Sequence, residues 1–467
     1  MTPRTLAWIA QATGGRLLGA DRTVDAIATD TRALPQGGAP LFVALKGENF
    51  DGHDHAAKAV AGGCVALLVS RVVQAYAPQV VVADTLRALA DLAAAVQRTR
   101  AGTRTVAITG SNGKTSVKTL AAAVLAQAGR THATPGNRNN EIGLPLAVID
   151  APDDADFAIY EMGTGAPGDI AYLTAVVQPD VALVNNVAPA HLERMGSLLE
   201  IANTKAAVYD DLRDGGVAVV NADDAYGEYF ASRAGGHRVL RFGLEASADV
   251  SARDIVLADD GSRFVLAMPD GEADVALAMP GRHNVRNALA AAAIGHAMGM
   301  GVAAIAAGLR AAQPVQGRLL AHVLQRGVVL VDDSYNANPG SLAAAIDTLA
   351  AAAGEAWLVL GDMRELGADE AALHAQVGAQ AKAAGIGRLH ALGPLSAHAA
   401  RAFGAGAQHH ATHEALAAAL IAELQERNDA QGGLRVLVKG SRGSAMDRIV
   451  RALLQRDAGA EGDTHAA

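Results

Sequence analysis

The sequence predicts an α/β protein of three domains: a small N-terminal α/β domain (1–84), a central domain with a parallel sheet (85–314) and a C-terminal Rossmann-like domain (315–467). Two observations support this prediction. Short β-branched and apolar runs alternate with helix-length segments along the chain, which is typical of parallel α/β sheets. The 467 residues are 51% hydrophobic and 19% charged, which suits about three well-packed domains.

Composition argues against several classes of protein. The net charge of −9 argues against a protein that binds nucleic acid over a broad surface. No apolar run is long enough to cross a bilayer, and no signal-peptide core follows Met1, so we expect no membrane partner. The single cysteine, Cys64, cannot form an internal disulfide and fits a reducing, cytoplasmic compartment.

The N-terminal domain should contain a small sheet flanked by helices. Its expected strands and helices are strands at 26–29, 41–45 and 65–69 and helices at 6–12 and 55–61. Polar clusters follow two of the strands, at 29–32 and 46–53. Ligands bind at strand ends in α/β sheets, but the same residue types also suit solvated turns, and both interpretations stay open.

The central domain should begin with a strand, a glycine loop and a helix. Val106–Ile108 is typical of a buried strand, and an Ala- and Leu-rich helix runs from Lys114 to about Gln127. The glycines of Gly110–Gly113 let backbone N–H groups turn inward around phosphate oxygens, and the helix N-terminus adds partial positive charge.

The side chains after this loop suit a nucleotide. Lys114 is placed for the outer phosphates, and Thr115 offers a hydroxyl to Mg²⁺. The loop is shorter than the usual G-x-x-x-x-G-K-[ST] pattern, because residue 108 is isoleucine. An ordinary turn between a strand and a helix is therefore the alternative.

The rest of the central domain continues the alternation. A helix at 85–97 and a linker at 98–102 precede the phosphate loop. The further elements expected are strands at 157–160, 181–184 and 216–220 and helices at about 169–177, 198–213 and 284–299. Asp-Gly turns at 260–261 and 270–271 predict short antiparallel strands between 246 and 280.

The C-terminal domain should be a Rossmann-like sheet. Its strands are expected at 328–331, 357–360, 388–392 and 434–438. The first of them lacks a following G-x-G-x-x-G, so we expect no dinucleotide cofactor. The small and polar tail, 457–467, is predicted to be disordered.

Three groups of polar side chains are candidates for chemistry. Glu161 follows a strand near the phosphate loop and could complete a Mg²⁺ site, although a helix cap is the alternative. His191 also follows an apolar strand, but most histidines at such positions only cap or pack, and Mg²⁺ prefers oxygen ligands. Asn284 and Asn287 lie three residues apart, so a helix puts both amides on one face. The two amides could hydrogen-bond the edge of an adenine, or they could simply belong to a polar first turn of the helix.

Together these motifs resemble the Mur ligase family, the ATP-dependent amide-bond ligases of peptidoglycan precursor synthesis. The motifs occur in the family's order: Thr109–Thr115, Glu161–Gly163, Asn185–His191, His283–Ala288, Gly317–Arg318 and Asp333–Pro339. Two N-terminal stretches, Asp30–Arg32 and Leu41–His53, are similar to the family's UDP-sugar-binding domain.

The details resemble the branch of the family that joins D-alanyl-D-alanine to UDP-N-acetylmuramoyl-tripeptide. The phosphate loop reads Thr-Gly-Ser at 109–111, and Gly136–Pro145 is similar to that branch's G-N-x-N-N-x-x-G-x-P stretch. Asp-Ser-Tyr-Asn-Ala-Asn-Pro at 333–339 stands where the ligases of the third residue carry Tyr-Ala-His-Thr-Pro. Their Asp-Asn-Pro-Arg motif for diaminopimelate is absent.

The resemblance implies roles for particular residues. The catalytic residues would be Lys114, Glu161, His191, Lys205 and Arg318. The ATP-binding residues would be Gly110, Ser111, Asn112, Gly113, Lys114, Thr115, Ser116, Asn284 and Asn287, with Asp332 or Asp333 at the ribose. The substrate-binding residues would be Asp30, Thr31, Arg32, Lys46, Asn137, Asn139, Asn140, Tyr335, Asn336, Lys439 and Arg442, of which Lys439 and Arg442 would face the dipeptide carboxylate.

The resemblance also implies two Mg²⁺ ions. Thr115 and Glu161 would hold the first, and His191 with a carbamylated Lys205 the second. A free lysine repels Mg²⁺, whereas a carbamate formed with CO₂ offers anionic oxygens. Ala207 stands close after Lys205, where family members often carry glutamate.

The implied reaction passes through an acyl phosphate, which ATP forms on the tripeptide carboxylate and the dipeptide amine then attacks. We expect the protein to act as a monomer in the cytoplasm. The alternatives are a sister ligase that adds the third residue, a ligase like folylpolyglutamate synthase, or a non-catalytic ATP-binding regulatory protein.

Overall fold

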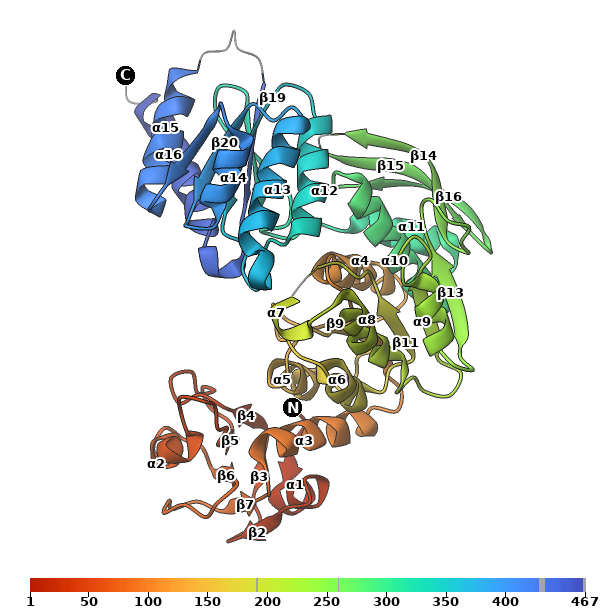
Figure 1. Ribbon diagram of the computed structural model, residues 1–467. Coiled ribbons are helices and arrows are strands. Elements are labelled where there is room, and N and C mark those ends of the chain that lie inside the picture. Colours follow the sequence, from red (N-terminus) through yellow and green to blue (C-terminus); the bar gives the residue numbers. More distant parts are fainter. Residues whose placement is uncertain (190–191, 259, 428–432, 465–467) are drawn as a thin grey trace.

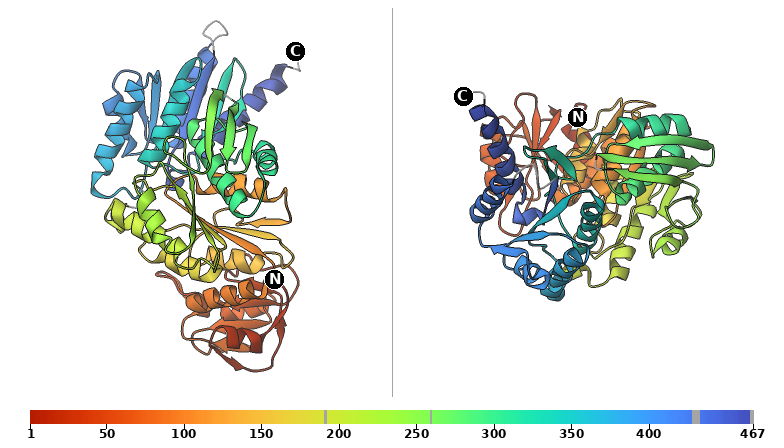
Figure 2. Two further views of the ribbon diagram at one scale, coloured as in Figure 1. Left: turned by 90° about the vertical axis from the view of Figure 1, so that its right-hand side faces the viewer. Right: turned by 90° about the horizontal axis from the view of Figure 1, so that it is seen from above.

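The computed structural model describes residues 1–189, 192–258, 260–427 and 433–464. Three α/β units follow one another in space, with the N-terminal unit at one end, the C-terminal unit at the other and the central unit between them (Figures 1 and 2). The predicted α/β class with three domains is confirmed. The boundaries near residues 84 and 314 stay predictions.

The N-terminal unit is built on a five-stranded sheet of order β2-β7-β6-β5-β4, in which only β2 runs antiparallel to its neighbour. β1 and β3 pair separately. The elements are β1 (Arg4–Thr5), α1 (Leu6–Ala12), β2 (Arg16–Leu18), β3 (Thr23–Val24), β4 (Ala26–Ala28), β5 (Pro40–Val43), η1 (Gly52–His55), α2 (Ala56–Ala61), β6 (Ala66–Val69) and β7 (Gln79–Val81). The predicted strand at 26–29 corresponds to β4, whereas the sequence missed the other strands of two or three residues, β1, β2, β3 and β7.

Helix α3 (Thr85–Thr99) joins the N-terminal unit to the central one (Figure 1). The side chain of Asp84 caps its first turn by accepting hydrogen bonds from two backbone N–H groups. The helix packs on α1 at one side and on α5 and α6 at the other, and the Tyr172 hydroxyl donates to the Leu86 carbonyl at 3.1 Å. Its apolar face therefore belongs to a core that both units share.

The segment after α3 is anchored, which corrects the prediction of a plain linker at 98–102. The Arg100 side chain is buried and donates to the carbonyls of Val148, Ile149 and Ala151 at the end of α5. It also pairs with Asp153 at 2.7 Å. A cation at a helix C-terminus satisfies orphan carbonyls and favours the helix dipole.

The central unit holds a six-stranded, fully parallel sheet of order β13-β12-β11-β8-β10-β9. Glu161 lies beside Ile108 and Val184 beside Thr109, so three strands end at one edge. The elements are β8 (Arg104–Thr109), α4 (Lys114–Leu125), β9 (Thr131–Ala133), α5 (Gly143–Asp150), β10 (Phe157–Glu161), α6 (Asp169–Val177), β11 (Val181–Val184), α7 (Leu192–Met195), α8 (Leu198–Ala206), η2 (Ala207–Tyr209), β12 (Val217–Asn221), α9 (Gly227–Arg233) and β13 (Arg238–Phe242). The sequence missed the edge strands β9 and β13.

A three-stranded antiparallel sheet follows, as the Asp-Gly turns predicted. It consists of β14 (Ser251–Ala258), β15 (Gly261–Met268) and β16 (Gly271–Leu277). Helices α10 (Arg282–Ala297) and α11 (Val302–Ala311) then pack against α4 and cover the phosphate-loop helix.

The C-terminal unit holds a second six-stranded sheet, of order β17-β18-β22-β19-β20-β21, in which only the edge strand β17 is antiparallel. The elements are β17 (Leu320–Val323), β18 (Val328–Asp333), α12 (Pro339–Ala351), β19 (Glu355–Gly361), η3 (Gly367–Asp369), α13 (Glu370–Ala383), β20 (Arg388–Leu392), α14 (Ser396–Phe403), β21 (Ala407–His410), α15 (His413–Glu426), β22 (Leu434–Lys439), η5 (Arg442–Ser444) and α16 (Asp447–Thr464).

Helix α16 continues through residues 457–464, and the disorder expected for the tail stays a prediction. Residues 465–467 lie outside the described part of the chain. Among the helices of the described residues, none is both long and apolar enough to span a bilayer.

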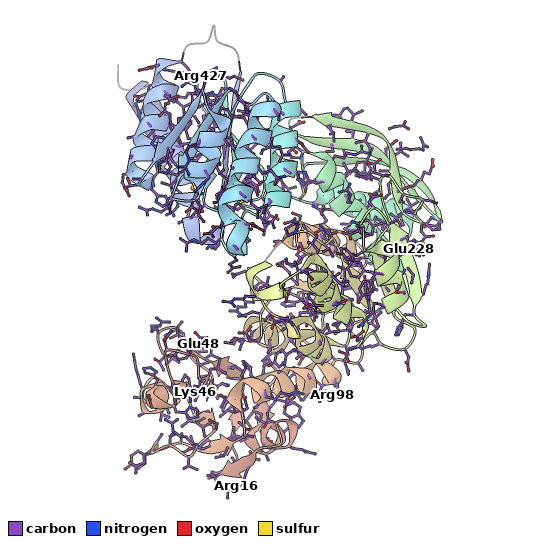
Figure 3. The ribbon with its side chains drawn as sticks, viewed as in Figure 1. Arg16, Lys46, Glu48, Arg98, Glu228 and Arg427 are labelled. Atoms are coloured by element: carbon purple, nitrogen blue, oxygen red, sulfur yellow. The ribbon has the colours of Figure 1, made fainter. Side chains whose placement is uncertain are left out.

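We expect Arg100→Ala to lower the free energy of unfolding by about 3 kcal/mol, because it removes charge-assisted hydrogen bonds and leaves buried carbonyls without donors. Urea unfolding followed by circular dichroism measures the change. Arg98→Ala is the matched control, since Arg98 lies exposed two residues earlier (Figure 3). Equal stability of the two variants would contradict the anchoring role.

Candidate active site

The phosphate loop, Gly110–Gly113, connects β8 to α4 and requires glycine at its end. Gly113 has φ +79°, and it precedes the first residue of α4. A Cβ there would lie 2.5 Å from Asn287 Oδ1 and 2.6 Å from Asn185 Nδ2. The loop backbone and its asparagine neighbours are therefore fitted to each other without room for a side chain.

Two asparagines at the end of β11 hold this loop in shape. The Ser111 N–H donates to the Asn186 carbonyl at 2.9 Å, and the Asn112 N–H donates to Asn186 Oδ1 at 2.8 Å. In return, the side-chain amides of Asn185 and Asn186 donate to the Asn112 carbonyl. The loop is thus preorganised by hydrogen bonds from a neighbouring strand.

Lys114 folds back over the loop that it follows. Its Nζ donates to the Gly110 carbonyl at 2.6 Å. Burial and the Arg318 guanidinium lower the pKa of Lys114 and outweigh the opposing effect of Glu161. The ammonium therefore lies where an anionic phosphate would be its strongest available partner.

Glu161, the last residue of β10, is a buried carboxylate with several donors. Its Oε2 accepts from the Thr115 hydroxyl at 3.0 Å and lies 3.1 Å from Lys118 Nζ, and its Oε1 accepts from Asn139 at 2.8 Å. Burial raises the pKa of Glu161, but Lys118, Lys114 and Asn139 outweigh it and hold the pKa below its usual value. A charged carboxylate and a hydroxyl side by side are oxygen ligands that suit Mg²⁺.

Lys205, on α8, is buried and lines the same cavity as Lys114 and Glu161. Burial, with nearby Lys114, lowers the pKa of Lys205 well below its usual value. A neutral amine is the form of lysine that reacts with CO₂, so the environment of Lys205 fits a carbamate.

The C-terminal unit reaches the phosphate loop through two contacts. Arg318 Nη2 lies 3.4 Å from the Thr115 hydroxyl, and its guanidinium lies 4.3 Å from the centre of the Tyr335 ring. Asn338 caps α12 and donates from Nδ2 to Asn112 Oδ1 at 2.7 Å. The N-terminus of α12 is thereby placed directly beside the loop.

These groups surround a cavity of about 600 Å³ between the central and C-terminal units. The predicted residues that line it are Gly110, Ser111, Asn112, Gly113, Lys114, Thr115, Asn139, Asn140, Glu161, Lys205, Arg318, Tyr335 and Asn336. Residues distant in the sequence thus meet at one site.

A second cavity of about 330 Å³ lies on the other side of the loop. The predicted residues that line it are Asn112, Gly113, Ser116, Asn284, Asn287, Arg318, Asp333 and Lys439. The two α10 amides do share a face, at 3.2 Å from each other. Each amide already makes one hydrogen bond within the protein, since Asn284 donates to the Pro280 carbonyl and Asn287 to Asn284 Oδ1, and each NH₂ group has a second N–H.

The two acidic residues at the end of β18, Asp332 and Asp333, have different partners. Asp332 accepts from the backbone and hydroxyl of Ser334 and stabilises the turn. Asp333 forms a buried ion pair with Lys439 at 2.5 Å, and Lys439 also donates to the Asn336 carbonyl. Asp333 lines the second cavity whereas Asp332 does not, so Asp333 is the better placed of the two for a ribose. Lys439 lines the same cavity with its charge paired to Asp333, and its role toward the dipeptide carboxylate stays a prediction. Arg442 is exposed and lies 5.4 Å from the Tyr335 ring.

Several predicted residues are absent from the linings of both cavities. Asp30 and Arg32 pair with each other at 2.7 Å on the N-terminal unit, where Thr31 and Lys46 also lie (Figure 3). Asn137 is exposed and lies in the segment of residues 134–140, here called the asparagine loop. His191 lies outside the described residues.

Lys118 and Asn338 are among the residues of the site that sequence reasoning missed. Lys118 lies one helical turn after Lys114 on an otherwise apolar face of α4, which was a readable signal for a buried charge. Asn338 precedes Pro339, and asparagine followed by proline is a common start of a helix.

Family models match the chain in three segments: the Mur ligase family catalytic domain at 23–97, the Mur ligase middle domain at 108–295 and the Mur ligase glutamate ligase domain at 317–442. Over 96% of its length the chain is 46% identical to 98% of the UDP-N-acetylmuramoyl-tripeptide–D-alanyl-D-alanine ligase of Escherichia coli.

Solved structures show the same similarity. MurF from Acinetobacter baumannii matches with a TM-score of 0.92 and 32% identity, over 97% of this chain and 99% of that one. MurF ligase from Thermotoga maritima, in complex with ADP, matches with a TM-score of 0.82 and 26% identity, over 92% and 97% of the two chains.

We expect Gly113→Ala to weaken ADP binding at least ~10-fold, because a left-handed alanine and its contacts with two asparagines strain the loop by about 1–3 kcal/mol. Isothermal titration calorimetry measures the affinity. Gly102→Ala is the control, since a Cβ at Gly102 has no neighbour within 4 Å. Unchanged ADP affinity in Gly113→Ala would remove this loop from the nucleotide site.

Proposed function

The chain belongs to the Mur ligase family, and from this premise we propose that it uses ATP to join D-alanyl-D-alanine to UDP-N-acetylmuramoyl-tripeptide, releasing ADP and phosphate. The observation that carries the proposal is the 46% identity to a ligase of that name over almost the whole of both chains. The cavity between the central and C-terminal units supplies the cationic and oxygen-bearing side chains that the reaction needs.

The first step transfers the outer phosphoryl group of ATP to the tripeptide carboxylate, which gives ADP and an acyl phosphate. Negative charge on the transferring group is stabilised by Lys114 and by Arg318, which approach it from different domains. The backbone N–H groups of Gly110–Gly113 hold the remaining phosphates in line.

Mg²⁺ bound to the phosphates would neutralise charge and orient them. Thr115 and Glu161 provide oxygen ligands for a first ion. We infer a second ion at Lys205, where CO₂ adds to the neutral amine with loss of a proton to give a carbamate. His191 is the further ligand proposed for that ion.

The second step is attack by the dipeptide amine on the acyl phosphate carbon, after which phosphate leaves from a tetrahedral intermediate. Water would destroy the acyl phosphate, so the site has to be closed when the intermediate forms. The contacts of Arg318 with Thr115 and of Asn338 with Asn112 join the C-terminal unit to the loop, and closure of the C-terminal unit over the site is part of the proposal.

The remaining substrate assignments are proposals of the same kind. The uridine diphosphate end would reach the N-terminal unit near Asp30, Thr31, Arg32 and Lys46. Asn139 and Asn140 would contact the tripeptide, and Tyr335 and Asn336 the dipeptide. Arg442, beside the Tyr335 ring, would also face the dipeptide. We place the protein in the cytoplasm, where ATP is available and the single thiol, Cys64, stays reduced.

With ATP, Mg²⁺ and UDP-N-acetylmuramoyl-tripeptide, we expect phosphate release that depends on D-alanyl-D-alanine and a pentapeptide product by mass spectrometry. Release with a single amino acid on a shorter precursor would indicate a sister ligase, and release with glutamate on a folate would indicate a folylpolyglutamate synthase. ATP binding with no turnover on any acceptor would indicate the regulatory protein.

We expect Lys205→Ala to lose at least ~100-fold in turnover, because the anionic ligand of the second ion is gone. High bicarbonate with a short carboxylic acid should restore part of the activity. In the wild-type protein, ¹³CO₂ should give a carbamate signal by NMR that is missing from the variant. Full activity of Lys205→Ala would exclude this residue from the site.

A further inference from the structure

Lys118 is the buried charge of the site to which the proposed mechanism gives no task. It lies on α4, with its side chain 7% exposed. Its Nζ donates to the carbonyls of Thr134 at 2.9 Å and Gly136 at 3.0 Å, and it lies 3.1 Å from Glu161 Oε2. Three acceptors surround the three N–H groups of this ammonium, so it is fully satisfied without any ligand.

The oxygen that Lys118 contacts is the one that faces the proposed metal site. Glu161 Oε2 also accepts from the Thr115 hydroxyl, the other oxygen-bearing group of that site. Among the described residues, no three His, Cys, Asp or Glu side chains gather into a cage for a cation. A divalent ion at Glu161 therefore needs most of its ligands from outside the protein.

Lys118 also fixes the asparagine loop, residues 134–140, to the same carboxylate. The loop's first carbonyls accept from Lys118, and its Asn139 donates to Glu161 Oε1 at 2.8 Å. The Gly163 N–H donates to the Asn139 carbonyl at 2.7 Å, and a Cβ at Gly163 would lie 2.9 Å from Asn139 Oδ1. Glu161, the proposed metal ligand, and the asparagine loop are therefore held together as one rigid group.

A plain ion pair that only supports the core is the simpler interpretation. A buried pair of that kind contributes little that apolar residues could not replace. Here Glu161 lines the cavity of about 600 Å³, whereas Lys118 does not. Lys118 therefore balances the charge of Glu161 from within the protein, while the carboxylate stays next to the cavity.

We propose that Lys118 is a positioning residue, which neutralises Glu161 before a divalent ion binds and makes Mg²⁺ binding depend on nucleotide phosphates. This inference rests on the proposed role of Glu161 as a Mg²⁺ ligand. Without nucleotide, Mg²⁺ would have to bind Glu161 while this carboxylate is paired with Lys118, whose positive charge repels the ion. Nucleotide phosphates add the negative charge that outweighs this repulsion, so metal and nucleotide bind together.

The first test is thermal unfolding of the full chain without nucleotide, in EDTA and in millimolar Mg²⁺. The wild-type midpoint should not respond to Mg²⁺. Lys118→Met leaves the Glu161 charge buried and uncompensated, so its midpoint should fall by at least ~5 °C in EDTA, and Mg²⁺ should recover most of the loss. Lys58→Met, at an exposed lysine of α2, should behave as wild type.

The second test is direct binding of Mn²⁺, followed by electron paramagnetic resonance in the absence of nucleotide. Lys118→Met should bind Mn²⁺ at least ~10-fold more tightly than the wild type, because the repelling charge is gone. Equal Mn²⁺ affinity of the two proteins, or an equal response of their midpoints to Mg²⁺, would overturn the inference.

The double variant Lys118→Met/Glu161→Gln keeps the test decisive if Lys118→Met does not fold. The double variant contains neither charge, so it should fold. Its midpoint of thermal unfolding should be higher than that of Lys118→Met and should not change with Mg²⁺. A double variant that fails to fold while Glu161→Gln folds would overturn the inference, since charge balance would then not be the role of Lys118. Ligation by the wild-type protein is unaffected by any of these outcomes and tests the proposed function separately.

Discussion

The rest of the site depends on one buried carboxylate, Glu161, which needs hydrogen-bond donors and a counter-charge around it. Charge in a protein interior is costly unless donors and a counter-charge surround it. Glu161 obtains them from three directions: Thr115 and Lys118 on the phosphate-loop helix, and Asn139 on the asparagine loop. These segments are ordered around the carboxylate, so the phosphate loop, the proposed metal ligands and the asparagine loop keep one geometry.

The site is divided between two units, and few contacts join them at the phosphate loop. Arg318 and Tyr335 stack beside Thr115, and Asn338 binds Asn112. Contacts of this kind are weak individually and reversible, which suits a site that admits substrates when open and excludes water when closed. Because the site lies between two units, its side chains come from segments that are far apart in the chain.

The N-terminal unit is attached in a different way. Helix α3 shares an apolar core with both units, and Arg100 ends the connection by capping α5 with a buried guanidinium. An apolar interface with a buried anchor favours a fixed arrangement over a hinge. The long substrate would then span a rigid pair of units, while the C-terminal unit closes over its reacting end.

The sequence by itself determined the α/β class, the phosphate loop and most of the cavity lining, because strand ends and glycine spacing are local patterns that parallel sheets bring together. It did not reveal that Arg100 is an anchor, that Asp332 serves a turn while Asp333 binds Lys439, or that the α10 amides already donate to protein acceptors. Nor did it show Lys118 behind Glu161. Only the tertiary structure decides these roles, because the partner of a buried charge or amide is set by neighbours distant in the chain, and residue type alone does not say whether a donor is free.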